Sequence, residues 1–274
     1  MSRKRRSAVQ RYHDRVAGCY DQTYDDDFWK WHDALTWDYL KPFLPRDQSA
    51  KIIDLGCGTG KWGARIARSG YHVTSVDISA QMLDQAREKI RTRPSSPPPV
   101  FVQADLCDLS ALRGEEFALA VALGDPVGCT PSPRKALKEI RRLLAPDGVL
   151  VATFDNRLSA LEFYLADGDP KAVARFLSQG RTHWLTQNAA EQFPIFTYAP
   201  SDVRRLIEAC GFEMLELVGK TVLPLRHQRH LLATAEARRA WARIEKGLSR
   251  NPDAVGRATH LQVACRVTHR RHCP

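Results

Sequence analysis

Three acidic residues and a cluster of glycines have the types and spacing to bind a nucleoside. Residues 54–60 read Asp-Leu-Gly-Cys-Gly-Thr-Gly, and Asp77 and Asp105 follow further along the chain. Glycines permit a tight turn of bare backbone, and the helix after it offers free N–H groups. The carboxylate of Asp77 could accept both hydrogen bonds of a ribose diol. Asp105 could accept from an adenine amino group, and Asp54 could pair with an α-ammonium group.

The same glycines also fit the dinucleotide pattern, through Gly58, Gly60 and Gly63 with Asp77 at a suitable distance. Two features favour a ligand without a pyrophosphate. The charge of Asp54 at the mouth of the turn would repel phosphate, and acids end three successive strands. A nucleoside bearing an amino acid is therefore the preferred ligand, and a dinucleotide remains the alternative.

Strands alternate with helical segments around these residues. We expect strands at 51–55, 71–76, 100–103, 117–123 and 149–154, and helices at 61–69, 80–92 and 132–144. Ser79 is the expected N-cap of the second helix. Such alternation predicts an α/β fold, with a parallel sheet covered by helices on both faces.

The remaining segments extend this core at both ends. Helical spacing at 7–19 and 27–44 predicts an N-terminal helical cap over residues 1–45, before a core at 46–155. The pattern loosens at 156–199, with two short helices and strands near 182–185 and 195–198, which we interpret as an inserted lid. Residues 200–274 should complete the sheet, with helices at 201–210 and 229–248 and strands at 212–218 and 260–267. The proline-rich stretch 93–99 reads as a surface loop.

Four ordered segments resemble the motifs of class I S-adenosylmethionine-dependent methyltransferases. Residues 52–60 resemble the first motif, 76–79 with Met82-Leu83 the second, 103–106 the third, and 143–150 the turn into strand five; 210–212 resemble the entry to strand six. The resemblance implies a Rossmann-like, seven-stranded, mostly parallel sheet of order 3-2-1-4-5-7-6, with strand seven antiparallel. It also implies S-adenosylmethionine as cofactor.

The resemblance further implies which residues hold this cofactor. Gly56, Gly58 and Gly60 would hold the methionyl end, Asp77 the ribose and Asp105 the adenine. Tyr20 resembles part of the lid that relatives fold over the cofactor, with plain helix packing as the alternative. The other expected contacts are Asp54, Cys57, Ile78, Met82, Ala104, Leu106 and Leu123.

Catalysis at a sulfonium methyl needs few side chains, because the protein only aligns a nucleophile and excludes water. Asp125, directly after the fourth strand, is the first catalytic candidate, to orient or deprotonate the acceptor. An ordinary Asp-Pro turn is the alternative. The segment 124–128 departs from the Asn-Pro-Pro-aromatic motif of base-amino methyltransferases, which argues against nucleobase amines.

Aromatic and histidine side chains supply the remaining candidates. His183 in the lid could act as a base, and the neighbouring Trp184 could stack on the acceptor. The alternative for His183 is a merely exposed histidine. Tyr24 and Trp29 could form a pocket wall, and core packing is the alternative for these aromatic residues. No metal site is expected, because nothing chelates beside the histidines of the tail, His269 and His272.

Charge and cysteine content exclude several classes of protein. The net charge of +10 comes largely from eight cations near the termini: Arg3, Lys4, Arg5, Arg6, Arg11, Arg266, Arg270 and Arg271. The body is therefore close to neutral, so nucleic acid is not the expected partner. Seven scattered cysteines without a Cys-x-x-Cys pair indicate neither a disulfide framework nor a zinc site. No apolar run is long enough to span a membrane and no signal peptide is visible, so a soluble, cytoplasmic protein is expected.

We therefore predict an S-adenosylmethionine-dependent methyltransferase acting on N, O or C of a small molecule. The acceptor is expected to be an aromatic or heteroaromatic metabolite, such as an intermediate of secondary metabolism. Three alternatives stay open: an RNA methyltransferase anchored by the basic tail, an NAD-dependent oxidoreductase and a non-catalytic cofactor-binding partner subunit. The sequence leaves a homodimer open.

Overall fold

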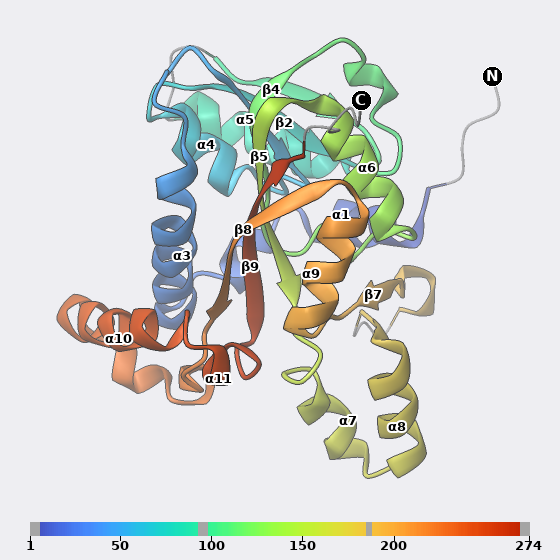
Figure 1. The fold of residues 1–274 in the computed structure, drawn as a ribbon, viewed down its shortest axis with the longest axis vertical. Coiled ribbons are helices and arrows are strands. Elements are labelled where there is room, and N and C mark those ends of the chain that lie inside the picture. The colour runs from blue at the N-terminus through green and yellow to red at the C-terminus, as the bar shows by residue number, and fades with distance from the viewer. Residues whose placement is uncertain (1–5, 93–97, 185–187, 269–274) are drawn as a thin grey trace, which may run out of the picture.

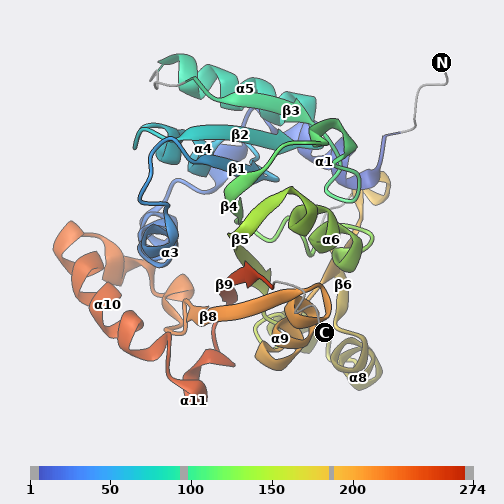
Figure 2. The same ribbon diagram turned by 45° about the horizontal axis from the view of Figure 1, so that its top comes forward.

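One seven-stranded sheet forms the centre of the computed structural model, in which residues 6–92, 98–184 and 188–268 are described. Its strands are β1 (Lys51–Leu55), β2 (His72–Asp77), β3 (Val100–Gln103), β4 (Phe117–Ala122), β5 (Leu144–Asp155), β8 (Phe212–Lys220) and β9 (His260–Val267). They lie in the order β3-β2-β1-β4-β5-β9-β8, which Figure 2 shows from top to bottom. Strands β1 to β5 pair in parallel, whereas β9 is antiparallel to β5 and β8.

The two lid strands form a hairpin of their own, apart from this sheet. Among the residues that the structure describes, strand β6 (Arg181–His183) pairs with β7 (Pro194–Phe196) alone. With the hairpin set aside, β9 and β8 are the seventh and sixth strands of the main sheet. The predicted Rossmann-like order 3-2-1-4-5-7-6 is thereby confirmed.

Helices cover both faces of the sheet. The α-helices are α1 (Ala8–Val16), α2 (Tyr20–Thr23), α3 (Asp27–Leu40), α4 (Lys61–Ala67), α5 (Ala80–Thr92), α6 (Pro133–Leu143), α7 (Leu161–Asp167), α8 (Pro170–Gln179), α9 (Pro200–Ala209), α10 (Ala235–Leu248) and α11 (Pro252–Val255). Short 3-10 helices are η1 (Lys41–Phe43), η2 (Ser110–Leu112), η3 (Ala189–Glu191), η4 (Leu225–His227) and η5 (Arg229–Leu232). Figure 1 shows α3 and α4 on one side of the sheet and α6 and α9 on the other.

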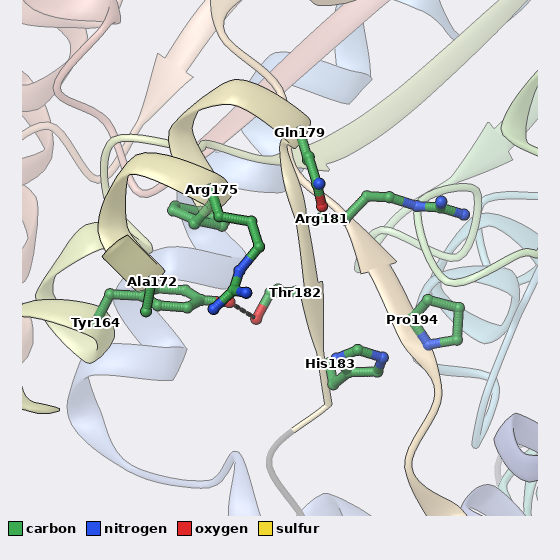
Figure 3. Close-up of a pocket in the computed structure, with 9 residues that line it drawn as sticks. Tyr164, Ala172, Arg175, Gln179, Arg181, Thr182, His183 and Pro194 are labelled. Atoms are coloured by element: carbon green, nitrogen blue, oxygen red, sulfur yellow. Dashed lines mark hydrogen bonds between the residues drawn. The ribbon is translucent and has the colours of Figure 1, made fainter. Parts of the chain in front are cut away.

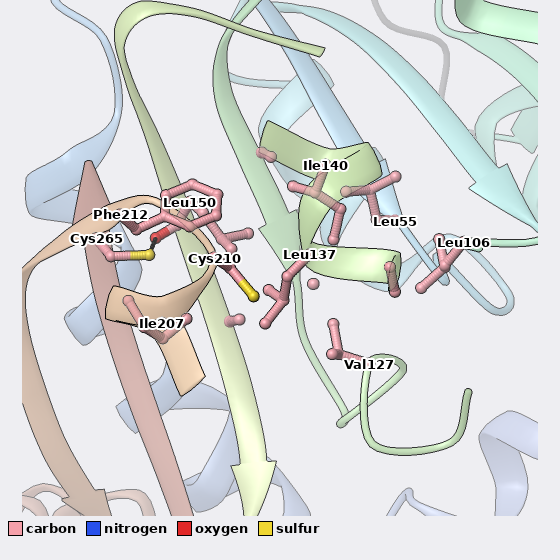
Figure 4. Packing of buried hydrophobic residues seen from close by; sticks show 14 of the residues in the cluster. Leu55, Leu106, Val127, Leu137, Ile140, Leu150, Ile207, Cys210, Phe212 and Cys265 are labelled. Atoms are coloured by element: carbon pink, nitrogen blue, oxygen red, sulfur yellow. Dashed lines mark hydrogen bonds between the residues drawn. The ribbon is translucent and has the colours of Figure 1, made fainter. Parts of the chain in front are cut away.

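Alternation along the buried strands divides the core into two layers. Successive side chains of a strand point to opposite faces. Leu150, Ala152 and Phe154 of β5 therefore join α6 and α9 in one cluster, whereas Val151 joins α3 and α4 in the other. Figure 4 shows part of the first cluster, in which Leu137 of α6 packs near the sheet. Helices thus cover both faces of the sheet, which is why its strands read as continuous apolar runs in the sequence.

Two elements differ from the sequence prediction. Strand β5 begins at Leu144, because Leu144 pairs with Phe117 before an irregularity that includes Asp147 in the left-handed region, at φ 61°. The predicted helix 229–248 is divided, since the Oγ1 of Thr234 accepts from the N–H of Ala237 and starts α10 there. Thr234 is the N-cap of α10 and separates this helix from η5. Apolar periodicity alone does not reveal such a cap.

Three helices of the N-terminal cap and the lid segment (residues 156–199) lie beside this core. Helix α3 packs with α10 and β8 in a third apolar cluster that includes Phe28, Trp31 and Leu232. Helices α7 and α8 lie side by side at one end of the molecule (Figure 1). Within the described ranges, no helix combines the length and apolarity needed to cross a bilayer. Predictions for residues 1–5, 93–97, Leu185 and the tail from residue 269 fall outside the described residues.

The buried layer under α6 predicts a large cost for removing one side chain. Leu137→Ala should lower the free energy of unfolding by about 2–5 kcal/mol, because Leu137 is fully buried and the cavity refills only partly. The same substitution at Leu165 on α7, which is 64% exposed, should change it by about 0.5 kcal/mol or less. Urea denaturation of both variants measures the difference. Equal losses would show that α6 does not form the core described here.

Candidate active site

The glycine turn between β1 and α4 is packed at both ends and open in its middle. Gly56, Gly58 and Gly60 all have positive φ, at 64°, 53° and 79°. A Cβ at Gly56 would lie 2.3 Å from the Cβ of Pro126, and one at Gly60 would lie 2.7 Å from the Cβ of Ala86. A Cβ at Gly58 would meet nothing within 4 Å. The turn therefore packs against the protein at both ends and leaves its middle free for a ligand.

Two of the predicted carboxylates hold this turn in place. Asp77 accepts hydrogen bonds from the N–H of Gly58 (2.8 Å) and of Ser79 (2.9 Å), so it joins the turn to the start of α5. Asp54 lies beneath the turn with 1% exposure and accepts from the N–H of Gly63 at 2.7 Å. Burial raises the pKa of Asp54 to about 7 and raises that of Asp77. The pairing of Asp54 with an ammonium group remains a prediction.

The other predicted cofactor residues fall into two groups. Asp105, Ile78 and Ala104 are half-buried around the ends of β2 and β3, and Asp105 accepts from the N–H of Cys107 at 2.8 Å. The second group is buried and supports the turn and the strand ends: Cys57, Met82, Leu106 and Leu123. The first group is therefore partly accessible and the second supports the turn, and the cofactor contacts of both groups remain predictions.

Three carboxylates of the N-terminal cap attach it to the turn and the helices that follow. Asp14 accepts from the Oγ of Ser79 at 2.6 Å, and Asp21 from the Oγ1 of Thr59 at 2.5 Å. The Nζ of Lys61 lies 2.7 Å from Asp33. The cap is consequently held over the same edge of the sheet at which the glycine turn lies.

A row of rings runs across this edge, from the cap to β9. The contacts, by distance between ring centroids, are His13–Tyr20 (6.3 Å), Tyr20–Tyr24 (5.0 Å), Tyr24–Trp29 (4.9 Å), Trp29–His32 (5.1 Å) and His32–His260 (5.2 Å). Tyr20, Tyr24 and Trp29 are half-buried, so part of each residue remains accessible. We call this set the ring row. The predicted pocket residues Tyr24 and Trp29 and the predicted cofactor residue Tyr20 all belong to it.

Asp125 is a buried residue of the turn after β4, with φ 55° and 3% exposure. One carboxylate oxygen accepts from the N–H of Gly128 (2.9 Å) and the other from the N–H of Asp155 (3.1 Å). Burial and the charge of Asp155 raise the pKa of Asp125 well above its usual range. The side chain therefore holds its own turn and the end of β5. Its catalytic role remains a prediction.

Sequence reasoning missed a polar cluster at the meeting point of β5, β8 and β9. The Nε2 of His260 lies 3.6 Å from the Oδ1 of Asp155, and the Nζ of Lys220 donates to the Oγ1 of Thr36 at 2.7 Å. Burial raises the pKa of Asp155 to about 6 and lowers that of Lys220 to about 7. Burial and the charge of Lys220 lower the pKa of His32 to about 4. One available signal was Asp155 itself, an acid at the end of a buried strand.

The predicted lid residues lie elsewhere. His183 is exposed on β6 and lines a cavity of about 430 Å³ near Pro194, across from Tyr164 (Figure 3). No hydrogen bond or ion pair joins His183 to Asp125 in the part of the chain that the structure describes. Trp184 packs with Tyr12 and Phe193, at ring distances of 5.4 and 6.0 Å. Trp184 thus attaches the lid segment to α1, and the roles predicted for both residues remain predictions.

The lid segment is nevertheless bonded to the site from two sides. Arg15 of α1 forms a two-pronged ion pair with Glu191, with N–O distances of 2.8 and 2.7 Å. The N–H of Phe196 donates to the carbonyl of Gly128 at 3.0 Å, in the turn that Asp125 holds. The hairpin is therefore hydrogen-bonded to the turn after β4.

Known proteins agree with this geometry. A family model described as "Methyltransferase domain" matches residues 52–148. The "Putative methyltransferase YqeM" of Bacillus subtilis (strain 168) is 30% identical in an alignment of 219 residues. This alignment covers 66% of this chain and 85% of that protein. The chain belongs to the class I S-adenosylmethionine-dependent methyltransferases.

Further relatives and structural neighbours of this protein are also methyltransferases. The "Ubiquinone biosynthesis O-methyltransferase" of Xanthomonas campestris pv. campestris (strain B100) is 26% identical over 187 residues, or 68% of this chain and 72% of that one. The CcbJ methyltransferase from Streptomyces caelestis shares the fold, with a TM-score of 0.63, 16% identity, and coverage of 96% of this chain and 100% of the other. The methyltransferase is therefore an enzyme with S-adenosylmethionine as cofactor, which decides against the oxidoreductase and the non-catalytic subunit.

The open middle of the glycine turn generates a test of where this methyltransferase binds its cofactor. Gly58→Ala should lower the affinity for S-adenosylhomocysteine at least tenfold, because the new methyl group would occupy the free space. Gly114→Ala is the matched control: Gly114 also has a positive φ (85°), and a Cβ there would meet nothing within 4 Å. Both variants should lose about 1–2 kcal/mol of stability from backbone strain. Calorimetric titration measures affinity, and equal affinities of the two variants would contradict the placement.

Proposed function

We propose that this methyltransferase transfers the methyl group of S-adenosylmethionine to a small aromatic metabolite. The cofactor would lie across Gly56, Gly58 and Gly60, with its ribose on Asp77 and its adenine beside Asp105. Gly58 supports this arrangement because it faces free space, and a carboxylate accepting two backbone bonds retains lone pairs for a diol.

The observation that carries the acceptor class is the ring row. It begins at His13, next to the Asp14 that bonds to Ser79, and ends at His260, beside Asp155. Its half-buried members offer apolar faces that stack on planar rings, while the polar groups at its far end can fix an orientation. A flat aromatic acceptor matches that combination better than a flexible aliphatic one.

The position of the row suits in-line transfer. Ligands of open α/β sheets bind outside the carboxyl ends of the strands. The glycine turn follows β1, Asp125 follows β4 and Asp155 ends β5, so the row spans from the cofactor side to the acceptor side. The cap and lid segment cover this edge, and excluding water there favours attack by the acceptor. The small-molecule class also agrees with the Xanthomonas relative, whose name places it in ubiquinone biosynthesis.

The ring row predicts a specific loss in acceptor binding. In a screen of phenols, catechols, indoles and anilines, the best acceptor should show a KM raised about 3–10-fold in Trp29→Ala, from an aromatic contact worth about 0.5–1.5 kcal/mol. Trp37→Ala is the control on the same helix. Trp37 lies under the guanidinium of Arg65 and packs against the core cluster of α3 and α4, so it is not part of the ring row. Affinity for S-adenosylhomocysteine should be unchanged in both. Methyl transfer to bulk tRNA in place of any compound in the screen would contradict the proposal.

A further inference from the structure

The lid segment forms a cavity where α7, α8 and the β6–β7 hairpin meet. Its volume is about 430 Å³, within the range of small-molecule sites. Tyr164 of α7, Phe176 of α8, Arg181 of β6 and Pro194 of β7 all line it. We call it the lid cavity. None of its lining residues belongs to the ring row, so it is separate from the proposed acceptor region.

One wall of the lid cavity is apolar and aromatic. The rings of Tyr164 and Phe176 stack, with centroids 4.4 Å apart and an interplanar angle of 15°. Phe176 is 2% exposed, so this pair is anchored within the lid segment. Ala172 and Pro194 extend the apolar lining. A flat apolar wall of this kind favours the body of an aromatic ligand.

The polar groups of the lid cavity are mainly hydrogen-bond donors. Arg175 and Arg181 contribute guanidinium groups, and Gln179 contributes an amide. The hydroxyl of Tyr164 donates to the Oγ1 of Thr182 at 2.8 Å, so the proton of the Thr182 hydroxyl is left to donate. Among the described residues, no aspartate or glutamate lines this cavity. Its lining is therefore rich in donors and in positive charge.

The two arginines of the lid cavity have no carboxylate partner. In the described part of the chain, neither Arg175 nor Arg181 forms an ion pair, although Arg181 lies over the ring of Phe196 at 4.6 Å. Arg157, in the same lid segment, does form an ion pair, at 2.7 Å from Asp202. Positive charges that line one space repel each other, and a bound anion offsets that repulsion.

The two arginines approach the lid cavity from different elements. Arg175 extends from α8 toward Thr182 of β6, and Arg181 projects from the other side of that strand (Figure 3). The guanidinium of Arg175 and the hydroxyl of Thr182 therefore form the inner set of donors, beside the ring of Tyr164. Arg181 adds positive charge near the rim.

We propose that the lid cavity binds a small aromatic carboxylate. Its ring packs against Tyr164, and its carboxylate accepts from the guanidinium of Arg175 and the hydroxyl of Thr182. A guanidinium can donate two parallel hydrogen bonds to the two oxygens of a carboxylate, which makes this contact strong and directional. This inference goes beyond the proposed function and does not depend on it, because the lid cavity and the ring row share no residue.

An aromatic carboxylate fits the lid cavity better than simpler ligands do. Inorganic phosphate would use the cations but leave the apolar wall without a partner. An uncharged aromatic amide would stack on Tyr164 but leave the guanidinium of Arg175 without a counter-ion. An organic cation would be repelled by both arginines.

Calorimetric titration of the full-length protein with 2-naphthoate tests the charge requirement. This probe should bind at least tenfold more tightly than uncharged 2-naphthamide, and added salt should weaken the binding of 2-naphthoate alone. Arg175→Gln should weaken it about tenfold and Arg181→Gln about threefold, because charge-assisted hydrogen bonds are stronger than neutral ones. Arg239→Gln, on an exposed arginine of α10, is the matched control and should bind 2-naphthoate like wild type.

A second variant fills the lid cavity without changing its charge. Ala172→Trp places a large side chain in the lining and should abolish the binding of 2-naphthoate. Ala174→Trp, at an exposed position of the same helix, is its control and should bind like wild type. Trp29→Ala alters the ring row and should also leave this binding unchanged. Every variant should bind S-adenosylhomocysteine like wild type, which shows that the fold is intact.

The outcomes separate this inference from the proposed function. Equal affinities for 2-naphthoate and 2-naphthamide, or a wild-type affinity in Arg175→Gln, would overturn the inference. Binding of inorganic phosphate without binding of 2-naphthoate would also overturn it, because the apolar wall would then have no role. Binding lost in Trp29→Ala but kept in Ala172→Trp would place the probe on the ring row instead. A protein that methylates no aromatic compound would refute the proposed function and leave this inference standing.

Discussion

The pairing of β9 between β5 and β8 is the constraint on which the polar cluster of Asp155, His260 and Lys220 depends. Because β9 is hydrogen-bonded along both edges, its register fixes the ends of three strands relative to one another. That register places His260 beside Asp155 and Lys220, and it places Gln262 under Thr36. A slip of one residue would turn each of these side chains to the opposite face.

The cofactor side depends on local geometry instead. Positive φ angles at Gly56, Gly58 and Gly60 are intrinsic to short sequence segments, and Asp77 bonds to backbone groups close by in the fold. The two sides meet where Pro126 packs against Gly56, so the turn after β4 is in contact with the turn after β1. The glycine turn and the polar cluster are thus built in two different ways, the first by local turns and the second by strand pairing, and both lie at the same edge of the sheet.

The same distinction explains what could be predicted from the sequence. The strands follow from apolar runs and the glycine turn from glycine spacing, which are local signals. The strand order is implied by the resemblance to class I methyltransferases. Asp125 is recognisable as a residue after a strand, but the use of both its oxygens by backbone N–H groups is not. The His260 cluster depends on antiparallel register between segments over 100 residues apart, which no local pattern reveals. The lid strands are predictable to within a few residues, yet the surroundings of His183 depend on how the hairpin docks.

Helix α1 bonds both to the start of α5 and to the lid segment. Asp14 bonds to Ser79 at the start of α5, and Arg15, one residue later, bonds to Glu191 in the lid segment. Neighbouring residues on one short helix thus connect both regions, and the helix cannot move away from one without straining its bond to the other. A displacement of α1 away from the start of α5 therefore also strains the ion pair between Arg15 and Glu191 in the lid segment.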